Sequence, residues 1–228
     1  MLRLSRPRAV LLTALLLALP LLGSVRAEEP AAAAAPAASQ VRVTTNMGEF
    51  VIELRPDRAP LTVTNFLRYV REGFYTNTLF HRVIANFVIQ GGGYDATTGK
   101  VKTQIHDGVF NESGNGLQNK RGAVGLARAE PAHSGNAQFY VDLADNPDLD
   151  PVPTRWGYAV FGRIVSGMDV VEHIGETPTG ALGEFKQDAP MKPVVILKAE
   201  IMGAAAAASP QTPTPVVPAR PDNILSPK

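Results

Sequence analysis

Residues 80 to 93 read FHRVIANFVIQGGG, and this stretch decides the fold. Two apolar segments, Leu79–Ile84 and Phe87–Gln90, follow each other at a spacing that predicts a pair of β-strands. Arg82 and Gln90 stand inside this apolar run. A guanidinium cannot be neutralised, and burying it without a partner costs free energy. Arg82 therefore either pairs with an anion in the interior or lies at the surface, where it has a functional role. The three glycines admit a closely approaching backbone or ligand.

The first 27 residues have the pattern of a secretory signal peptide. Arginines precede an apolar run of 14 residues, Ala9–Leu22, and small residues lead up to Ala27, the expected cleavage position. The run is shorter than the roughly 18 residues of a membrane span. Cleavage removes four arginines and no acid, so the formal charge changes from +1 to −3. We expect a periplasmic or secreted protein with no membrane attachment after cleavage.

Composition also divides the rest of the chain. Residues 28–39 form an Ala/Pro-rich linker and residues 204–228 a Pro/Ala-rich tail, both expected to be disordered, around a folded domain at 40–203. The mature chain has no basic block, so no nucleic-acid partner is expected. It has no cysteine, which excludes disulfides and thiolate zinc sites, and its histidines are scattered. We expect no metal and no cofactor.

The folded unit is mostly β. A helix is predicted from Pro60 to its stop at Gly73, a second around Val170–Ile174, and a long polar loop over Tyr94–Arg121. Further strands are predicted at Val41–Thr45, Glu49–Leu54, Ala123–Ala127, Ala137–Leu143, Gly157–Val165 and Val194–Ile201. Many short strands with Gly/Pro turns and two helices favour an antiparallel β-barrel with helices outside it.

Residues 80–92 as a whole resemble the signature of the cyclophilin-type peptidyl-prolyl cis-trans isomerases, in particular the bacterial periplasmic members. Three further motifs occur in family order: GAVGLARA at 122–129, NAQFYV at 136–141 and GYAVFG at 157–162. The resemblance covers about Val41 to Ile201. It implies a mainly β fold, a closed eight-stranded antiparallel β-barrel capped by two α-helices. The interior would be filled by side chains, and the active site would lie on the outer wall.

The resemblance also implies an isomerase. Rotation about a prolyl amide has a barrier of about 18–20 kcal/mol, because the C–N bond has double-bond character. When resonance breaks, the proline nitrogen gains a lone pair, to which a fixed guanidinium can donate. The resemblance assigns this catalytic role to Arg82. No proton transfer is required, so we expect activity to be nearly independent of pH between about 6 and 9.

Substrate binding is assigned by motif position. The residues that the resemblance places in the substrate site are Phe87, Val88, Gln90, Ala127, Arg128, Gln138, Phe139, Tyr140, Leu149 and Tyr158. Phe139 stands behind the apolar wall, Gln90 holds Arg82 or the substrate backbone, and the main chain of Arg128 pairs with the substrate. The family usually has phenylalanine at Tyr140 and methionine at Val88.

The expected partners are proline-containing segments of unfolded or partly folded exported proteins, bound by a monomer. Two other classes of function stay open: a binding module that holds prolines without turning them, and a barrel that carries a small apolar ligand. His81 follows a core residue and precedes Arg82. As a strand neighbour of Arg82 it should point to the opposite face and have a structural role.

Overall fold

The computed structural model describes residues 40–103 and 106–202. The predicted signal peptide, linker and C-terminal tail lie outside the described residues. Within the described residues, no helix has both the length and the apolar character needed to cross a membrane.

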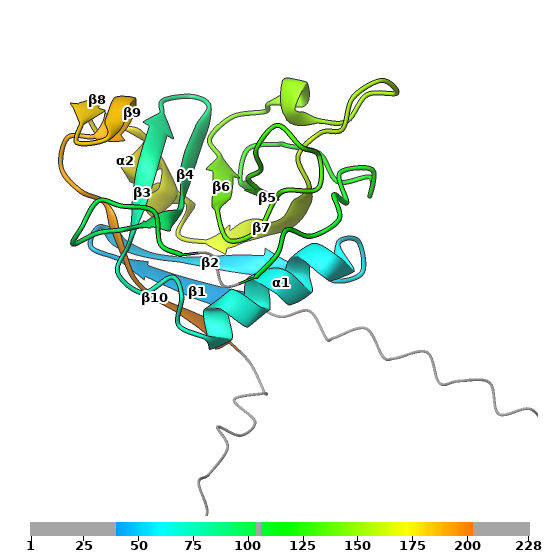
Figure 1. Ribbon diagram of the computed structural model, residues 1–228, viewed down its shortest axis with the longest axis horizontal. Helices are drawn as coiled ribbons and strands as arrows, with labels where there is room; N and C mark the ends of the chain where they lie inside the picture. Colours follow the sequence, from blue (N-terminus) through cyan, green and yellow to red (C-terminus); the bar gives the residue numbers. More distant parts are fainter. Residues whose placement is uncertain (1–39, 104–105, 203–228) are drawn as a thin grey trace, which may run out of the picture. The chain divides into compact units, whose positions relative to one another are not determined.

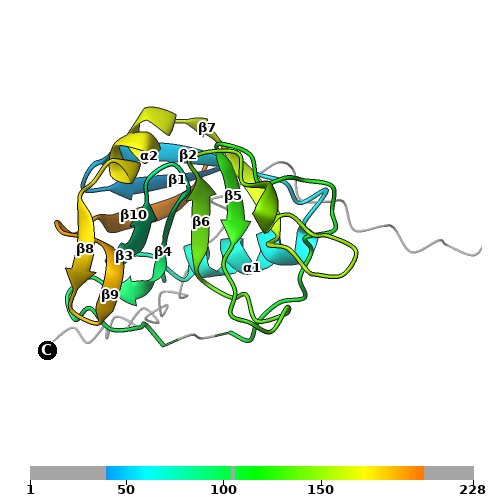
Figure 2. The same cartoon turned by 90° about the horizontal axis from the view of Figure 1, so that it is seen from above.

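Eight antiparallel strands close into a barrel in the order β1-β10-β3-β4-β6-β5-β7-β2 (Figures 1 and 2). The barrel strands are β1 (Gln40–Thr45), β2 (Gly48–Leu54), β3 (Thr78–Ile84), β4 (Val88–Asp95), β5 (Ala123–Leu126), β6 (Phe139–Asp142), β7 (Val160–Ser166) and β10 (Val195–Met202). Helices α1 (Pro60–Arg71) and α2 (Met168–Gly175) lie on opposite sides of the barrel. The predicted fold class is confirmed.

Local chemistry explains how the first elements form. The β1–β2 hairpin closes with Thr45 opposite Gly48, and the Thr45 hydroxyl donates to the Gly48 carbonyl oxygen at 2.8 Å. Helix α1 begins at Pro60, which needs no backbone donor. The free N–H groups of Leu61 and Thr62 donate to the carboxylate of Glu112, 3.1 and 2.8 Å away. A glutamate from the long loop therefore completes the helix start.

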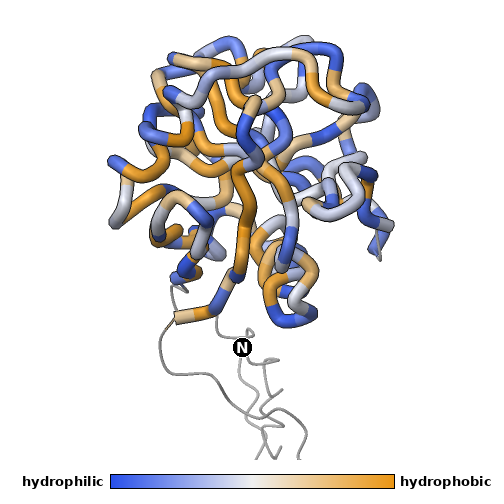
Figure 3. The backbone as a smooth tube through the Cα atoms, turned by 90° about the vertical axis from the view of Figure 1, so that its left-hand side faces the viewer, coloured by the Kyte–Doolittle hydropathy of each residue, from blue (hydrophilic) through white to orange (hydrophobic). Residues whose placement is uncertain are grey.

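The barrel interior is filled by large apolar side chains. Phe50, Phe66, Phe80, Phe139 and Phe161 are each at most 1% exposed. Apolar residues alternate with polar ones along much of the chain, as Figure 3 shows. Within the described residues the interior is thus packed with aromatic and aliphatic side chains, as the resemblance predicted.

Several elements differ from the sequence prediction: β6, for example, begins at Phe139, two residues after the predicted Ala137. Strand β4 continues through the glycines to Asp95, because Gly92 adopts a φ of +83° and the strand bends without ending. Strand β7 begins at Val160, three residues later than predicted. A two-stranded hairpin, β8 (Thr179–Leu182) and β9 (Phe185–Pro190), was not predicted, and it lies beside β3. Its strands are largely exposed and carry no alternating apolar pattern.

Candidate active site

Arg82 lies on the outer wall of the barrel, opposite Gln90 across the β3–β4 ladder. Its Nη1 donates to Gln90 Oε1 at 3.4 Å, and Gln90 Nε2 donates in turn to Gln138 Oε1 at 3.1 Å. The Arg82 side chain is 39% exposed. The side-chain amides of Gln90 on β4 and of Gln138, just before β6, therefore orient the guanidinium, while part of its surface remains open to a ligand.

A second anchor for Arg82 comes from the unpredicted hairpin. Asp188 on β9 has a φ of +59°, and its Oδ2 lies 3.8 Å from Arg82 Nε. On another side, the Arg82 guanidinium carbon lies 5.9 Å from the centre of the Phe87 ring. The carboxylate and the ring therefore limit the orientations of the guanidinium from two directions.

An apolar wall adjoins Arg82. Val88 and Tyr140 are 2% and 4% exposed, whereas Phe87 and Leu149 are half-buried. Tyr140 lies opposite Gln90 across the β4–β6 ladder, so the wall and the amides share adjacent strands. Phe139 instead belongs to the barrel core, where its ring packs edge-on against the ring of Phe80 and other core aromatics. It supports the wall from behind.

The Tyr140 hydroxyl has a protein partner. It donates to Asn119 Oδ1 at 2.5 Å, and Asn119 donates from its main chain and its side chain to Asp150 Oδ1, each at 2.8 Å. Gly125 makes room for the ring, because a Cβ there would overlap the Tyr140 hydroxyl end. Burial and the nearby Asp142 carboxylate hold the pKa of Tyr140 well above its ordinary value. The Tyr140 hydroxyl therefore stays neutral and hydrogen-bonded to Asn119 although the surrounding wall is apolar.

Arg128 and Tyr158 extend the site beyond Tyr140. The Arg128 guanidinium carbon lies 4.7 Å from the centre of the Tyr158 ring, and Tyr158 packs edge-on against Tyr140 with ring centroids 6.0 Å apart. Such a cation–π contact stabilises the stack by about 0.5–2 kcal/mol. The apolar wall thus continues from Tyr140 through Tyr158 to Arg128.

The side chain of Arg128 is occupied by its own chain. Nε donates to the carbonyl oxygen of Gly157 at 3.2 Å, Nη1 to that of Ala129 at 3.0 Å and Nη2 to that of Trp156 at 3.0 Å. Among residues 40–103 and 106–202, no group bonds the main-chain N–H or carbonyl of Arg128. The preceding residue, Ala127, donates its N–H to the Gln138 carbonyl at 2.9 Å. Within the described residues, the main-chain polar groups of Arg128 therefore remain available to a ligand.

Arg82, Val88, Gln90 and Tyr140 therefore lie on the adjacent strands β3, β4 and β6, whereas Phe139 faces the core. A family model described as cyclophilin type peptidyl-prolyl cis-trans isomerase/CLD matches residues 40–201. The chain belongs to the cyclophilin family. It is a peptidyl-prolyl cis-trans isomerase and acts on proline-containing peptides.

Individual relatives agree with this assignment. A peptidyl-prolyl cis-trans isomerase of Streptomyces antibioticus is 45% identical over 168 residues, which cover 72% of this chain and 99% of the relative. Peptidyl-prolyl cis-trans isomerase B of Escherichia coli is 46% identical over 155 residues, covering 67% and 93%. A cyclophilin-type isomerase structure from Cryptosporidium parvum matches with a TM-score of 0.62 and 26% identity, covering 73% of this chain and 98% of that one.

His81 is the buried neighbour of Arg82 in this cyclophilin. It is 8% exposed, and its ring lies 4.4 Å from that of Tyr94 and 5.6 Å from that of Phe185. Burial, assisted by the Arg82 charge, lowers its pKa to about 4, so the imidazole is neutral at pH 7. The register of β3 is irregular between Phe80 and Arg82, and both His81 and Arg82 contact β9. Strict strand alternation, on which its predicted orientation rested, does not hold here.

Asp142 is a buried carboxylate that the sequence analysis did not single out. It is 0% exposed and lies opposite Val88 across the β4–β6 ladder. Asn146 Nδ2 donates to Asp142 Oδ1 at 2.7 Å and to the Phe87 carbonyl at 3.0 Å, whereas Asp142 Oδ2 has no partner among the described residues. Burial raises the pKa of Asp142 to about 7. A titratable group therefore lies behind the Phe87–Val88 wall.

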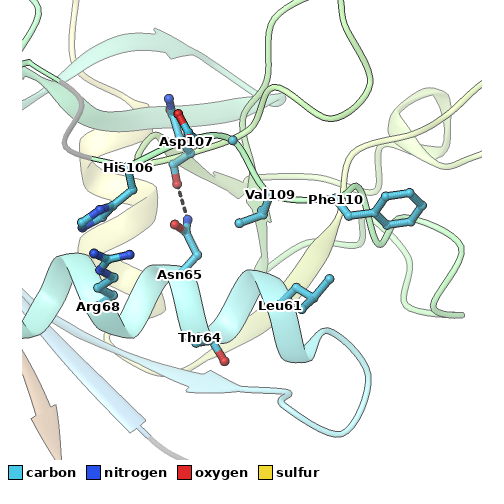
Figure 4. A pocket seen from close by; sticks show the side chains of 10 residues that line it. Leu61, Thr64, Asn65, Arg68, His106, Asp107, Val109 and Phe110 are labelled. Atoms are coloured by element: carbon cyan, nitrogen blue, oxygen red, sulfur yellow. Dashed lines mark hydrogen bonds between the residues drawn. The ribbon is translucent and has the colours of Figure 1, made fainter.

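A large hollow on the surface of this cyclophilin lies elsewhere. It has a volume of about 940 Å³ and lies between α1 and residues 106–110 (Figure 4). Asn65 on α1 donates to the Asn136 carbonyl at 2.6 Å on its floor, and polar side chains such as Arg68 and His106 line it. None of the residues assigned to substrate binding lines this hollow. Volume alone therefore does not identify the active site.

Proposed function

We propose that Arg82 is the catalytic residue of this isomerase and that the proline ring of the substrate sits in the recess formed by Phe87, Val88, Tyr140 and Leu149. The observation that carries the proposal is a partly exposed guanidinium, oriented by Gln90 and Asp188, at the edge of an apolar wall. The recess holds the ring while the other side of the amide turns.

The chemistry asks for better binding of the twisted amide than of either planar form. A planar prolyl nitrogen has no lone pair to accept a hydrogen bond. Once the amide twists, the nitrogen becomes a pyramidal amine, and an Arg82 N–H can donate to it. One hydrogen bond to a charged donor contributes about 1.5–3 kcal/mol, which corresponds to roughly ten- to a hundredfold in rate.

The remaining groups bind and align the peptide. The free main-chain groups of Arg128 pair with the substrate backbone next to Ala127. Gln90 and Gln138 hold Arg82 or the substrate backbone by their amides, and Tyr158 borders the recess. Phe139 acts only as support. A solved Cryptosporidium parvum cyclophilin that is 27% identical to this chain carries the words "in the presence of dipeptide ala-pro" in its title, which is consistent with recognition of a short proline-containing segment.

Replacing Arg82 tests this role. Arg82→Ala should lower kcat/KM for a proline tetrapeptide by at least about tenfold in a protease-coupled assay, because the transition-state donor is lost. The circular dichroism spectrum should stay native, since Arg82 is at the surface. A natively folded variant with near-wild-type turnover would refute the assignment.

We further propose that the substrates are unfolded or partly folded exported proteins, that the enzyme works in the periplasm or outside the cell, and that it is a monomer. The support is the signal-peptide pattern of residues 1–27. Cell fractionation and mass measurement of the mature chain should give a soluble exported protein that begins at Glu28. A cytoplasmic protein that retains residues 1–27 would contradict this proposal without affecting the isomerase site.

A further inference from the structure

Three aromatic side chains form an exposed cluster outside the proline recess. The rings of Phe110 and His133 stack with centroids 4.3 Å apart at 17°, and Trp156 packs edge-on against both, at 5.6 and 5.2 Å. Phe110 is 54% exposed and Trp156 is 43% exposed. Single exposed apolar residues are ordinary on protein surfaces, but mutually packed aromatic rings that remain this exposed are typical of binding sites.

The cluster rests on a rigid frame. The main-chain N–H of Asn111 donates to His133 Nδ1 at 3.1 Å, and its side chain donates to the carbonyls of Ala132 and Gly157, both at 3.0 Å. Asn111 is only 6% exposed. One buried amide therefore ties together the three segments that carry the rings. In Figure 4 the Phe110 ring is directed away from the hollow beside α1, so it does not serve to fill that hollow.

The cluster is continuous with the proline recess. Tyr140 in the recess packs against Tyr158, Tyr158 lies under the Arg128 guanidinium, and Arg128 Nη2 donates to the Trp156 carbonyl at 3.0 Å. The successive contacts on this path measure 6.0, 4.7 and 3.0 Å, and an extended chain advances roughly 3.3 Å per residue, so a few residues span it. A polypeptide with its proline in the recess can therefore reach the cluster.

A hollow on the surface borders Trp156. It has a volume of about 360 Å³ and lies between residues 113–114 and the loop 151–156, which contributes Pro151, Val152 and Pro153. Val152 is 47% exposed. The space and its apolar lining suit one aromatic or large aliphatic side chain.

We propose that the Phe110–His133–Trp156 cluster and this adjoining hollow form a secondary site for an aromatic or large aliphatic side chain of the substrate polypeptide, a few residues from the isomerised proline. The inference rests on the proposed recess at Tyr140 as the proline site. It makes the enzyme selective for prolines with an apolar residue nearby in the sequence. Unfolded chains expose such residues, whereas folded proteins bury them.

Trp156 is the single tryptophan of the chain and reports directly on the cluster. The probes are twelve-residue peptides with one central proline and a phenylalanine five residues before or five residues after it, each matched by a peptide with serine instead. At least one phenylalanine peptide should change the tryptophan emission at an affinity roughly three- to tenfold tighter than its serine partner, since one ring is partly buried. The same difference should appear in the Arg82→Ala variant, because this binding needs no turnover.

Variants then localise the effect. Phe110→Ala should remove the preference for phenylalanine while leaving turnover of a proline tetrapeptide unchanged, because the short peptide does not reach the cluster. Leu197→Ala is the matched control: Leu197 is 48% exposed on β10, and its loss should change neither measurement.

The outcomes separate the two proposals. Equal affinities for the phenylalanine and serine peptides, or a preference that survives Phe110→Ala, would overturn the secondary site. A change in tryptophan emission with protein concentration in the absence of peptide would also overturn it, since the cluster would then be a contact between copies. Loss of tetrapeptide turnover in Phe110→Ala would show that the residue acts on the recess itself and would likewise overturn it. A wild-type enzyme that turns over no tetrapeptide at all would instead refute the proposed proline site.

Discussion

Two arginines lie near the proposed proline recess, and their surroundings differ. Arg82 is held by side chains, Gln90 and Asp188, at distances of 3.4 and 3.8 Å, and it is 39% exposed. Arg128 donates from three guanidinium nitrogens to main-chain carbonyls at 3.0–3.2 Å and stacks on Tyr158. The Arg82 guanidinium therefore keeps N–H groups that can donate to a ligand, whereas the Arg128 guanidinium donates to main-chain carbonyls and holds a loop in place.

The surroundings also differ in ionisable groups. Next to Arg82 lies buried His81, and behind the Phe87–Val88 wall lies buried Asp142. Around Arg128 the partners are main-chain carbonyls, which do not titrate. We therefore expect the stability of the Arg82 region to depend on pH through His81 and Asp142.

The largest expected effect is the pH dependence of stability that buried Asp142 and His81 produce. The pKa of Asp142 is raised to about 7, so its contribution to stability is present below pH 4 and is lost as the pH rises to about 7. The pKa of His81 is lowered to about 4, so its contribution is present above pH 6.5 and is lost as the pH falls to about 4. At about 1.4 kcal/mol per pKa unit, the two contributions are roughly 4 and 3 kcal/mol and have opposite slopes between pH 4 and 6.5.

Single substitutions at Asp142 and His81 should reveal the slope of stability against pH that each group contributes. Asp142→Asn should raise the melting temperature by several degrees at pH 8, where wild-type Asp142 is charged and buried, and should leave a stability that increases from pH 4 to 6.5. His81→Gln should leave a stability that falls over the same range. Melting curves of both variants from pH 4 to 8 provide the measurement. A melting temperature of Asp142→Asn that parallels wild type at every pH would show that Asp142 does not titrate as described.

The next effect contrasts the two guanidinium groups directly. Arg82→Lys should lower kcat/KM by about tenfold or more, because an ammonium on a flexible stem does not reproduce the fixed planar fork. Arg128→Lys is the matched control and should keep kcat nearly unchanged, since the proposed contact with the substrate is made by the Arg128 main chain. Equal losses of kcat in both variants, measured with the same tetrapeptide, would contradict the claim that the side chain of Arg82, and not that of Arg128, acts in catalysis.

Truncating Arg128 should affect stability more than rate. Arg128→Ala removes four hydrogen bonds and a cation–π contact, at a cost of about 2 kcal/mol in the free energy of unfolding and several degrees in melting temperature. We expect a higher KM as the loop around Trp156 loosens, and little change in kcat. Urea unfolding together with steady-state kinetics checks both, and a large fall in kcat with unchanged stability would contradict this account.

The smallest effect belongs to Asp188. An exposed ion pair contributes about 0.2–1 kcal/mol, so Asp188→Asn should reduce kcat/KM only about two- to fivefold, through less uniform orientation of Arg82. The loss should appear in kcat, and added salt should weaken wild type towards the variant. A loss seen only in KM, with no salt dependence, would argue that Asp188 contacts the substrate instead.

The comparison also shows how far the sequence predicts this molecule. The Arg82–Gln90 pairing lies within one hairpin whose apolar pattern and glycines are visible in residues 80–93, and the strands β1, β2, β5 and β10 follow from local patterns within one or two residues. Asp188, Asn119 and Asp142 were not singled out, because their partners are distant in the chain or their burial depends on tertiary packing. The β8–β9 hairpin has few buried residues, so it leaves no periodic signal.

The central claim is that Arg82 stabilises the twisted amide and not the bound peptide. Exchange NMR at equilibrium measures both quantities on one sample: the affinity for a proline tetrapeptide and the cis–trans interconversion rate of the bound peptide. For Arg82→Ala we predict a Kd within about threefold of wild type and an interconversion rate at least about tenfold slower. An unchanged interconversion rate combined with a Kd raised about tenfold would contradict the account, because Arg82 would then be a binding residue only.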